Sequence, residues 1–446
     1  MSESITSVAE GATSPELRKI GRKAIVAASV GSALEWYDVF LYLYFALTIS
    51  KLFFPTGNEW VSLLATVGAF GVSYLVKPIG ALVMSSYADR VSRKAALTVT
   101  LSLMGIGVGL TAFAPTYRTI GIAGTAIIVM ARFIQGFSSG GEYGAATAFL
   151  VERAPAHRYG FYSSFNIAAI GLTSVMGGLA GMLVNSLLSP QQVSDWGWRL
   201  PFIFGLTIIP VALHIRRTIP EPSKRSHARA PLTEAVSGHK VRLILLMGAF
   251  ALVSVSNYAL VYYLPTYAVR NLGLPPSSAF TATAVTGAVV ALFSPLFGHV
   301  SDRWGRMRVM IFAAVALAVC PVPAYAIVVN HPTLAYLIVS QIILGILLTW
   351  YQAPMPALIC DLFPPAIRTT GVAIVHDFTA TFFGAFTPFM ITLLIGLTGS
   401  KLIPGIYASC IAVLSLTCMF ATRAMFGESW RPEESGAAKR VLGPAR

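Results

Sequence analysis

Two carboxylates, Glu35 and Asp38, stand in a stretch that is otherwise aromatic and aliphatic, ALEWYDVFLYLYF (33–45). If this stretch crosses a bilayer, each charge costs about 2.5–3.5 kcal/mol on insertion scales, so acids there are rare and mark proton or ion pathways. Residues three apart on a helix face the same side, and two close carboxylates repel each other when both are ionised. We therefore interpret Asp38 as a group that binds and releases a proton. Glu35 either assists it, or snorkels towards the membrane surface or bonds a neighbouring helix.

Arg132 lies at a matching depth in another apolar run. At 1.5 Å per residue, Asp38 falls about 21 Å into a helix that enters from the cytoplasm, and Arg132 about 18 Å into one that enters from outside. Opposite charges near the midplane should pair, because an unpaired charge there is costly. We interpret Arg132 as the counter-ion of Asp38 and as a candidate cation for an anionic substrate. The alternative is a structural salt bridge that fixes helix packing.

Other charged residues inside apolar runs are Lys77, Glu142, His376 and Asp377. Lys77 and Glu142 each lie about 15–18 Å from the cytoplasmic end of a helix, so we expect them to pair with each other, mainly in a structural role. The neighbours His376 and Asp377 either line a translocation path or titrate with the proton; alternatively, they satisfy each other within the bundle. The candidate substrate-binding residues are Arg132, Gln135, Lys77, Glu142, Asn257, Tyr262, Gln352 and Asp377.

The elements that must hold these charges are long apolar runs. Of the 446 residues, 55% are hydrophobic and 11% are charged, against roughly a quarter charged in a soluble domain. Runs of about 20 apolar residues cross a hydrocarbon core as helices, since helices satisfy their own backbone groups. The sequence thus predicts an all-α membrane protein with twelve transmembrane helices. Their expected ranges are 24–49, 61–85, 95–114, 120–151, 159–188, 198–215, 241–267, 279–300, 309–329, 334–359, 370–397 and 402–423.

The net charge is +14, and the distribution of the Lys and Arg residues along the chain indicates how the chain is oriented in the membrane. Most Lys and Arg residues fall in alternate loops and in both tails, which by the positive-inside rule places both termini in the cytoplasm. No basic cluster outside the helices is interleaved with base-stacking aromatics, so we expect no nucleic-acid partner. We expect a monomer in a lipid bilayer, in a bacterial inner membrane.

One polar segment divides the helices six and six. It is rich in Pro, Ser and positive charge and reads RRTIPEPSKRSHARAPLTEAVSGHK (216–240). Its position predicts a cytoplasmic linker between two bundles. The expected organisation is an N-terminal tail (1–23), an N-terminal six-helix bundle (24–216), the linker (217–240), a C-terminal six-helix bundle (241–424) and a C-terminal tail (425–446).

The two halves repeat a charged loop. ADRVSRK (88–94) matches SDRWGRM (301–307), and acids and an arginine recur after the fourth and tenth helices. Two related bundles with a site between them are the arrangement of an alternating-access carrier. We interpret the loop charges as ion pairs that latch the cytoplasmic side shut; the alternative is charge that only sets topology. These gate candidates are Asp89, Arg90, Arg93, Glu152 and Arg158, with Asp302, Arg303, Arg306, Asp361 and Arg368 in the second half.

At these loops the chain resembles the major facilitator superfamily, whose signature reads approximately G-x-x-x-D-R-x-G-R-R. GHVSDRWGRMR (298–308) fits this pattern well. The first copy departs from it, with Ser92 at the turn glycine. The resemblance implies two pseudo-symmetric six-helix bundles. In proton-coupled sugar carriers of this superfamily an Asp and an Arg occupy the motif positions of Asp38 and Arg132, which implies that protonation of Asp38 frees Arg132 and gates the cycle.

Four further motifs resemble the metabolite–proton symporter family, which includes citrate or tricarballylate, 2-oxoglutarate, shikimate and proline/betaine carriers. They are GSALEWYDVFLY, RFIQGFSSGGEYGAATAFLVERAP, DWGWRLPFIFG and TPFMITLLIGLTG. This resemblance implies proton-coupled import of a small organic acid, such as a di- or tricarboxylate. The alternatives are proton symport of a zwitterion such as proline or betaine, and an uncoupled facilitator.

Other classes of function lack their sequence features. No G-x-x-x-x-G-K-[ST] loop occurs, so a nucleotide-driven pump is not expected. We expect no enzyme activity, because the loops hold no clustered nucleophile, and no metal or other cofactor beyond a co-transported proton. The four cysteines lack ligand spacing, which favours packing roles. A passive channel would need neither midplane charge pairs nor a repeat.

Overall fold

The computed structural model describes residues 36–37, 40–91, 93–140, 143, 147, 150–151, 154–218, 236, 238–364 and 367–427. Within these ranges all regular structure is helical. The helices of the N-terminal half are α3 (Ala46–Phe53), α4 (Glu59–Leu75), α5 (Lys77–Arg90), α6 (Arg93–Phe113), α7 (Tyr117–Ile120), α8 (Ile122–Ser138), α10 (Tyr159–Leu187), α11 (Pro190–Gln192) and α12 (Arg199–Thr218).

The C-terminal half contains α14 (Lys240–Ser256), α15 (Leu264–Leu272), α16 (Pro276–Trp304), α17 (Arg306–Val319), α18 (Pro321–Asn330), α19 (Leu334–Gln352), α20 (Met355–Leu362), α21 (Arg368–Thr379), α22 (Thr387–Thr398) and α23 (Ile403–Phe426). Two π-helical segments, η4 (Asn257–Tyr262) and η5 (Ala380–Ala385), join α14 to α15 and α21 to α22. They make α14–η4–α15 and α21–η5–α22 near-continuous rods.

Proline divides several of the predicted spans into two helices. α5, α15, α18, α20 and α22 each carry a proline in their first turn. Proline has no N–H and clashes with the carbonyl four residues earlier, so it ends the preceding helix, but it is well suited to the first turn of the next. The predicted run 61–85 is therefore observed as α4 and α5.

Eight stretches of the described residues are long and apolar enough to cross a membrane, and Thr98–Phe113 and Ile122–Ser138 are shorter apolar helices. The eight are Glu59–Met84, Tyr159–Leu187, Lys240–Tyr262, Pro276–Trp304, Arg306–Asn330, Leu334–Leu362, Arg368–Thr398 and Ile403–Phe426. Large apolar side chains such as Ile122 and Leu292 are exposed on the outside, as expected for a surface that faces lipid.

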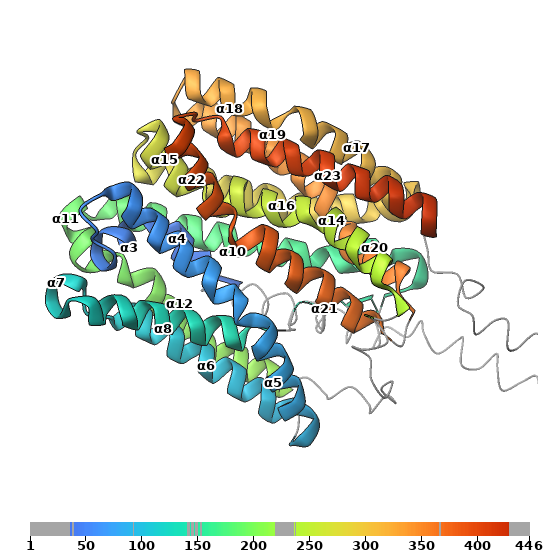
Figure 1. The fold of residues 1–446 in the computed structure, drawn as a ribbon, viewed down its shortest axis with the longest axis horizontal. Helices are drawn as coiled ribbons and strands as arrows, with labels where there is room; N and C mark the ends of the chain where they lie inside the picture. Colours follow the sequence, from blue (N-terminus) through green and yellow to red (C-terminus); the bar gives the residue numbers. More distant parts are fainter. Residues whose placement is uncertain are drawn as a thin grey trace, which may run out of the picture.

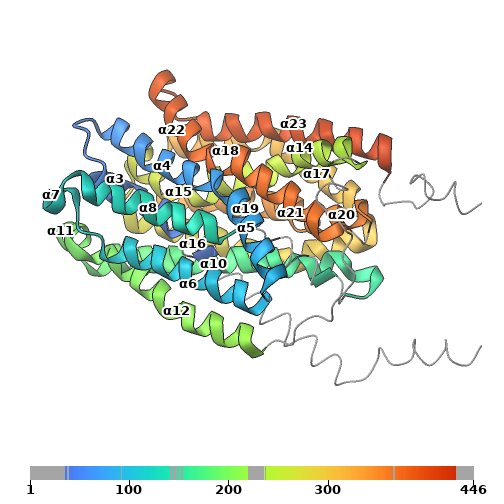
Figure 2. The same cartoon turned by 60° about the horizontal axis from the view of Figure 1, so that its bottom comes forward.

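The two halves form bundles that pack against each other. Figure 1 shows the blue and cyan helices of the first half on one side, the orange and red helices of the second half on the other, and α10 beside α16 between them. The second view agrees (Figure 2). Among the described residues, the bundles meet laterally where α10 packs against α16 and where α4–α5 pack against α21–η5–α22.

Small residues line the contact between α10 and α16. A Cβ added at Gly171 would lie 2.5 Å from the Ala291 backbone nitrogen, and one at Gly178 would lie 2.6 Å from that of Ala284. Gly287 and Gly298 of α16 contact the backbone of α10 equally closely. Such contacts let two helix backbones approach within a membrane. We call this contact the glycine interface.

Candidate functional site

The break between α4 and α5 places polar groups at the other lateral contact. Because Pro78 has no N–H, the Tyr74 carbonyl loses its helical partner. The Thr381 hydroxyl of η5 donates to this carbonyl at 3.3 Å, from the other bundle. A proline in one bundle thus exposes an acceptor that a threonine of the other bundle satisfies. We call the contact of α4–α5 with α21–η5–α22 the charged interface.

Lys77, the first residue of α5, joins the two bundles. Its Nζ lies 3.2 Å from Asp377 Oδ1 of α21, and the lysine side chain is 2% exposed. His376 Nδ1 is 2.9 Å from the same oxygen. The carboxylate thus bridges a cation of the opposite bundle and its own neighbouring imidazole. Pairing is what makes charges tolerable at this depth.

Aromatic rings enclose this ion pair. Lys77 Nζ lies 5.3 Å from the ring centroid of Trp36 and 5.4 Å from that of Tyr74, both within cation–π range. The His376 ring stacks on Tyr143 at 3.7 Å between centroids and 9° between planes. Phe250 packs edge-on against the imidazole. The rings exclude water, which strengthens the charge interaction.

Arg132 lies inside the first bundle. The side chain is 2% exposed, its NH2 group donates to Thr111 Oγ1 at 3.1 Å, and its guanidinium lies 4.5 Å from the Tyr42 ring centroid. Its predicted partner Asp38 lies outside the described residues, and so does Glu35. So does Glu142, the predicted partner of Lys77.

Three predicted substrate-binding side chains carry amides. Asn257 of η4 donates to Gln352 Oε1 at 2.7 Å, which links two helices of the second bundle. The Gln352 Nε2 atom is buried with no hydrogen-bond partner. The Gln135 amide, one turn from Arg132, is 4% exposed and has neither atom paired. Buried amides normally find hydrogen-bond partners, so these amide atoms are candidates to bond a polar solute.

Tyr262 takes part in an aromatic contact between the bundles. Its ring stacks on Phe40 at 3.6 Å, and Phe40 in turn meets Tyr258 edge-on. The Tyr258 hydroxyl donates to that of Tyr74 at 2.7 Å. Rings of both bundles therefore close the space beside the Lys77–Asp377 pair.

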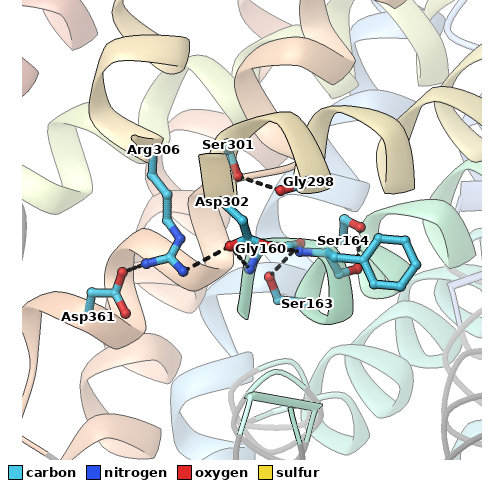
Figure 3. Close-up of polar contacts among 9 residues, drawn as sticks. Gly160, Ser163, Ser164, Gly298, Ser301, Asp302, Arg306 and Asp361 are labelled. Carbon is cyan, nitrogen blue, oxygen red and sulfur yellow. Dashed lines mark hydrogen bonds and ion pairs between the residues drawn. The ribbon is translucent and has the colours of Figure 1, made fainter. Parts of the chain in front are cut away.

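The C-terminal end of α16 and the N-terminal end of α10 are joined by one carboxylate. Asp302, near the end of α16, accepts the Gly160 N–H at 2.8 Å and the Phe161 N–H at 2.9 Å (Figure 3). These are unpaired N–H groups of the first turn of α10, and the helix dipole adds a favourable field for an anion. Asp302 thus caps a helix of the opposite bundle.

Arg306 holds this carboxylate in place. Its NH2 group lies 3.1 Å from Asp302 Oδ1, and its NH1 group pairs with Asp361 (Figure 3). Both ion pairs lie within the second bundle. Across the interface, helix N–H groups rather than a side chain supply the positive partner of Asp302.

The remaining gate candidates are less informative. Arg158 and Arg303 are exposed, and Arg368 is partly buried at the start of α21. Glu152 lies outside the described residues, as do the side chains of Asp89, Arg90 and Arg93.

Sequence reasoning missed a contact at the opposite end of the charged interface. The Trp60 indole Nε1 donates to the Thr392 carbonyl at 3.1 Å. A Cβ on Gly396 would lie 2.1 Å from that nitrogen, so α22 accommodates the ring only because residue 396 is glycine. Sequence reasoning also missed the pairing of Lys77 with Asp377. Its signal was the break at Pro78 and a similar depth in the two helices.

Comparisons with known proteins agree with this architecture. A model of the Major Facilitator Superfamily matches residues 28–293 and 270–445. The citrate-proton symporter of Klebsiella pneumoniae is 32% identical over 409 residues, which cover 90% of this chain and 92% of the relative. The proline/betaine transporter of Escherichia coli K12 is 27% identical over 411 residues, 89% of this chain and 82% of the relative.

A solved structure of a D-xylose-proton symporter has the same fold. It superposes with a TM-score of 0.72 at 19% sequence identity, covering 89% of this chain and 97% of the symporter. At that identity the likeness concerns the fold alone.

Proposed function

The chain belongs to the major facilitator superfamily, and from this premise we propose that it imports a small organic acid together with protons. A di- or tricarboxylate is the expected substrate, and alternating access of one site between the two bundles is the expected mechanism. The citrate-proton symporter from Klebsiella pneumoniae, similar over most of both chains, supports the substrate class.

The observation that carries this proposal is the buried pair of Lys77 and Asp377. A permanent structural link between rocking bundles would hinder transport, whereas an ion pair can break and form again with another anion. Its cation, Lys77, is 2% exposed and surrounded by rings, so a carboxylate that reaches it is desolvated and strongly attracted. Arg132 offers a second buried cation in the first bundle.

Contacts at both ends support alternating access. Asp302 of α16 contacts α10 at one end of the bundles. Trp60 of α4 contacts α22 at the other end. We propose that the Asp302 contact is the cytoplasmic gate and the Trp60 contact the outer gate. Each consists of a few hydrogen bonds, which is weak enough to open in every cycle.

Proton coupling is assigned to Asp38, with Arg132 as its counter-ion and Glu35 as a possible helper. Asp38 precedes Tyr42 by four residues in the sequence, the spacing of neighbours on one helical face, and Tyr42 lies against the Arg132 guanidinium. Protonation of Asp38 would release Arg132 and change the arrangement of the first bundle.

A zwitterion such as proline or betaine is the second candidate. The charged interface offers both a cation and a carboxylate, and the rings of Trp36 and Tyr74 already hold one ammonium group. Aromatic faces also bind quaternary ammonium groups. The similarity to the proline/betaine transporter of Escherichia coli agrees with this alternative.

The location follows from the same proposal. We propose a monomer in a bacterial inner membrane, with both termini in the cytoplasm, in contact with lipid and not with nucleic acid. It would need no cofactor apart from the proton that it carries.

Uptake by the purified protein in liposomes tests the proposal. An inward-directed proton gradient should drive accumulation of labelled citrate, and a protonophore should abolish it. Glycine betaine and proline serve as comparison solutes. Accumulation of betaine but not citrate would favour the second candidate, and citrate entry that equilibrates without responding to the gradient would contradict coupling.

A further inference from the structure

The carboxylate of Asp377 pairs with Lys77, which is the cation that an acidic substrate would need. Lys77 Nζ and Asp377 Oδ1 are 3.2 Å apart, and aromatic rings pack around the lysine. An incoming carboxylate would contact Nζ most favourably in the place that Asp377 now holds. Two anions on one buried lysine would repel each other in a medium of low dielectric.

We propose that the substrate carboxylate and Asp377 are alternative partners of Lys77, and that the exchange takes up one proton. The substrate displaces Asp377 from Lys77, and the proton enters the pair formed by His376 and Asp377. This inference rests on the proposed function only in requiring that the substrate is an acid. It adds a second proton site, in the bundle opposite to Asp38.

The charges balance in this exchange. Before it, Lys77 carries one positive charge and Asp377 one negative charge. After it, Lys77 faces the substrate carboxylate, and Asp377 has lost the cation that stabilises its negative charge. One proton neutralises it. The hydrogen bond between His376 Nδ1 and Asp377 Oδ1 makes the two side chains a single titrating unit that holds this proton.

Lys77 is the charged side chain that the described residues of the opposite bundle place beside the His376–Asp377 unit. Among the described residues, the titratable side chains close to this unit are Lys77 of α5, Tyr74 of α4 and Tyr143. Cys360 of α20 lies near Tyr143 in turn. Phenols and a buried thiol carry no charge near neutral pH. Among the described groups, loss of the lysine contact therefore removes the positive charge next to Asp377.

The exchange also releases a link between the bundles. Lys77 belongs to α5 and Asp377 to α21, so their ion pair ties the two bundles together. A substrate on Lys77 removes that tie and leaves the neutral contacts of the charged interface, such as Thr381 with the Tyr74 carbonyl. Substrate binding and proton uptake together would thus permit the bundles to move.

Calorimetry of citrate binding to the full-length purified protein tests the exchange. Titrations in two buffers of different ionisation enthalpy give the number of protons taken up per citrate. Asp377→Asn should take up one proton fewer than the wild type at the same pH. Lys77→Met should bind citrate at least about tenfold more weakly, since a charged hydrogen bond is lost, and Lys77→Arg should restore most of that affinity.

Controls separate misfolding from a failed hypothesis. Lys77→Gln combined with Asp377→Asn removes both charges of this ion pair together, so it should fold where single variants do not, and it should still bind citrate at least about tenfold more weakly. Lys51→Gln, in an exposed ion pair, should behave like the wild type. An unchanged proton count in Asp377→Asn, or wild-type affinity in Lys77→Met or in the neutral pair, would overturn the exchange.

The wild type separates this inference from the proposed function. If it neither binds nor transports citrate, the acid substrate is wrong and the exchange falls with it. If it transports citrate with a proton while Asp377→Asn keeps the full proton count, the proposed function stands and the exchange alone is overturned.

Discussion

The two lateral interfaces between the bundles differ in chemistry. At the glycine interface, α10 and α16 run together along their length, with backbone against backbone at Gly171 and Gly178. At the charged interface, side chains meet: Lys77 with Asp377, and Trp60 with the Thr392 carbonyl. Backbone contacts of small residues allow little rearrangement, whereas side-chain contacts can exchange partners.

This difference assigns a separate task to each side of the molecule. The glycine interface keeps the bundles close and is suited to act as the axis about which they tilt. The charged interface carries the groups that a proton or an anion can change. Asp302 lies on the same side as the glycine interface but contributes a side-chain contact, which is the contact that we propose as the cytoplasmic gate.

The largest effect is expected from a methyl group at the glycine interface. In Gly171→Ala the new Cβ would lie 2.5 Å from the Ala291 backbone nitrogen, and the helices must separate. Overpacking of this kind costs about 1–3 kcal/mol. We expect citrate transport to fall at least about tenfold and the melting temperature to decrease, measured by uptake and by thermal unfolding.

The matched control lies on the charged side. A Cβ at Gly68 would lie 3.6 Å from the Phe389 side chain, which is ordinary van der Waals contact. Gly68→Ala should therefore transport at close to the wild-type rate. Equal losses in the two variants would remove the distinction between the interfaces.

The next effect concerns the cap on α10. Asp302→Asn weakens the contact with the Gly160 and Phe161 N–H groups, and loss of a cap costs typically about 1 kcal/mol. The population open to the cytoplasm should increase about fivefold, measured by cysteine labelling from that side. Labelling that stays at the wild-type level would show that this contact is no gate.

A smaller effect is expected at the outer contact. Trp60→Phe removes the hydrogen bond to the Thr392 carbonyl but keeps a ring against Gly396. One neutral hydrogen bond contributes about 0.5–1.5 kcal/mol. Labelling from the outside should rise about threefold while labelling from the cytoplasm falls. A rise on both sides would mean that Trp60 stabilises the fold and not one state.

The smallest effect serves as the baseline. Lys51 and Glu59 form an ion pair at 3.4 Å with both side chains mostly exposed. Exposed pairs contribute little. Lys51→Gln should change neither uptake nor melting temperature measurably, and a large loss would show that charge near the outer end matters beyond the two interfaces.

The fold could be predicted from the sequence because its signals are local. Apolar runs, the distribution of Lys and Arg, and the two related loops at 88–94 and 301–307 each report one property of the chain. The prolines are visible in the sequence, but an apolar run does not show whether its helix breaks before a proline, as it does before Pro78. Only the backbone reveals that the break frees the Tyr74 carbonyl.

The site was less predictable because depth does not give direction. Lys77 lies at a similar depth to several acids, and the sequence does not say which of them its side chain faces. We predicted Glu142, which lies outside the described residues, and did not predict the observed contact with Asp377. The cap on α10 was hidden for another reason. Its positive partners are the backbone N–H groups of Gly160 and Phe161, which leave no charge in the sequence.

The central claim is that buried charge between and within the bundles couples a proton to an organic acid, and Asp38→Asn in proteoliposomes tests it most directly. Citrate counterflow and citrate accumulation driven by a pH gradient are measured side by side in the variant and the wild type. We predict that counterflow persists in the variant while accumulation disappears. Uphill accumulation retained at the wild-type level would contradict the account.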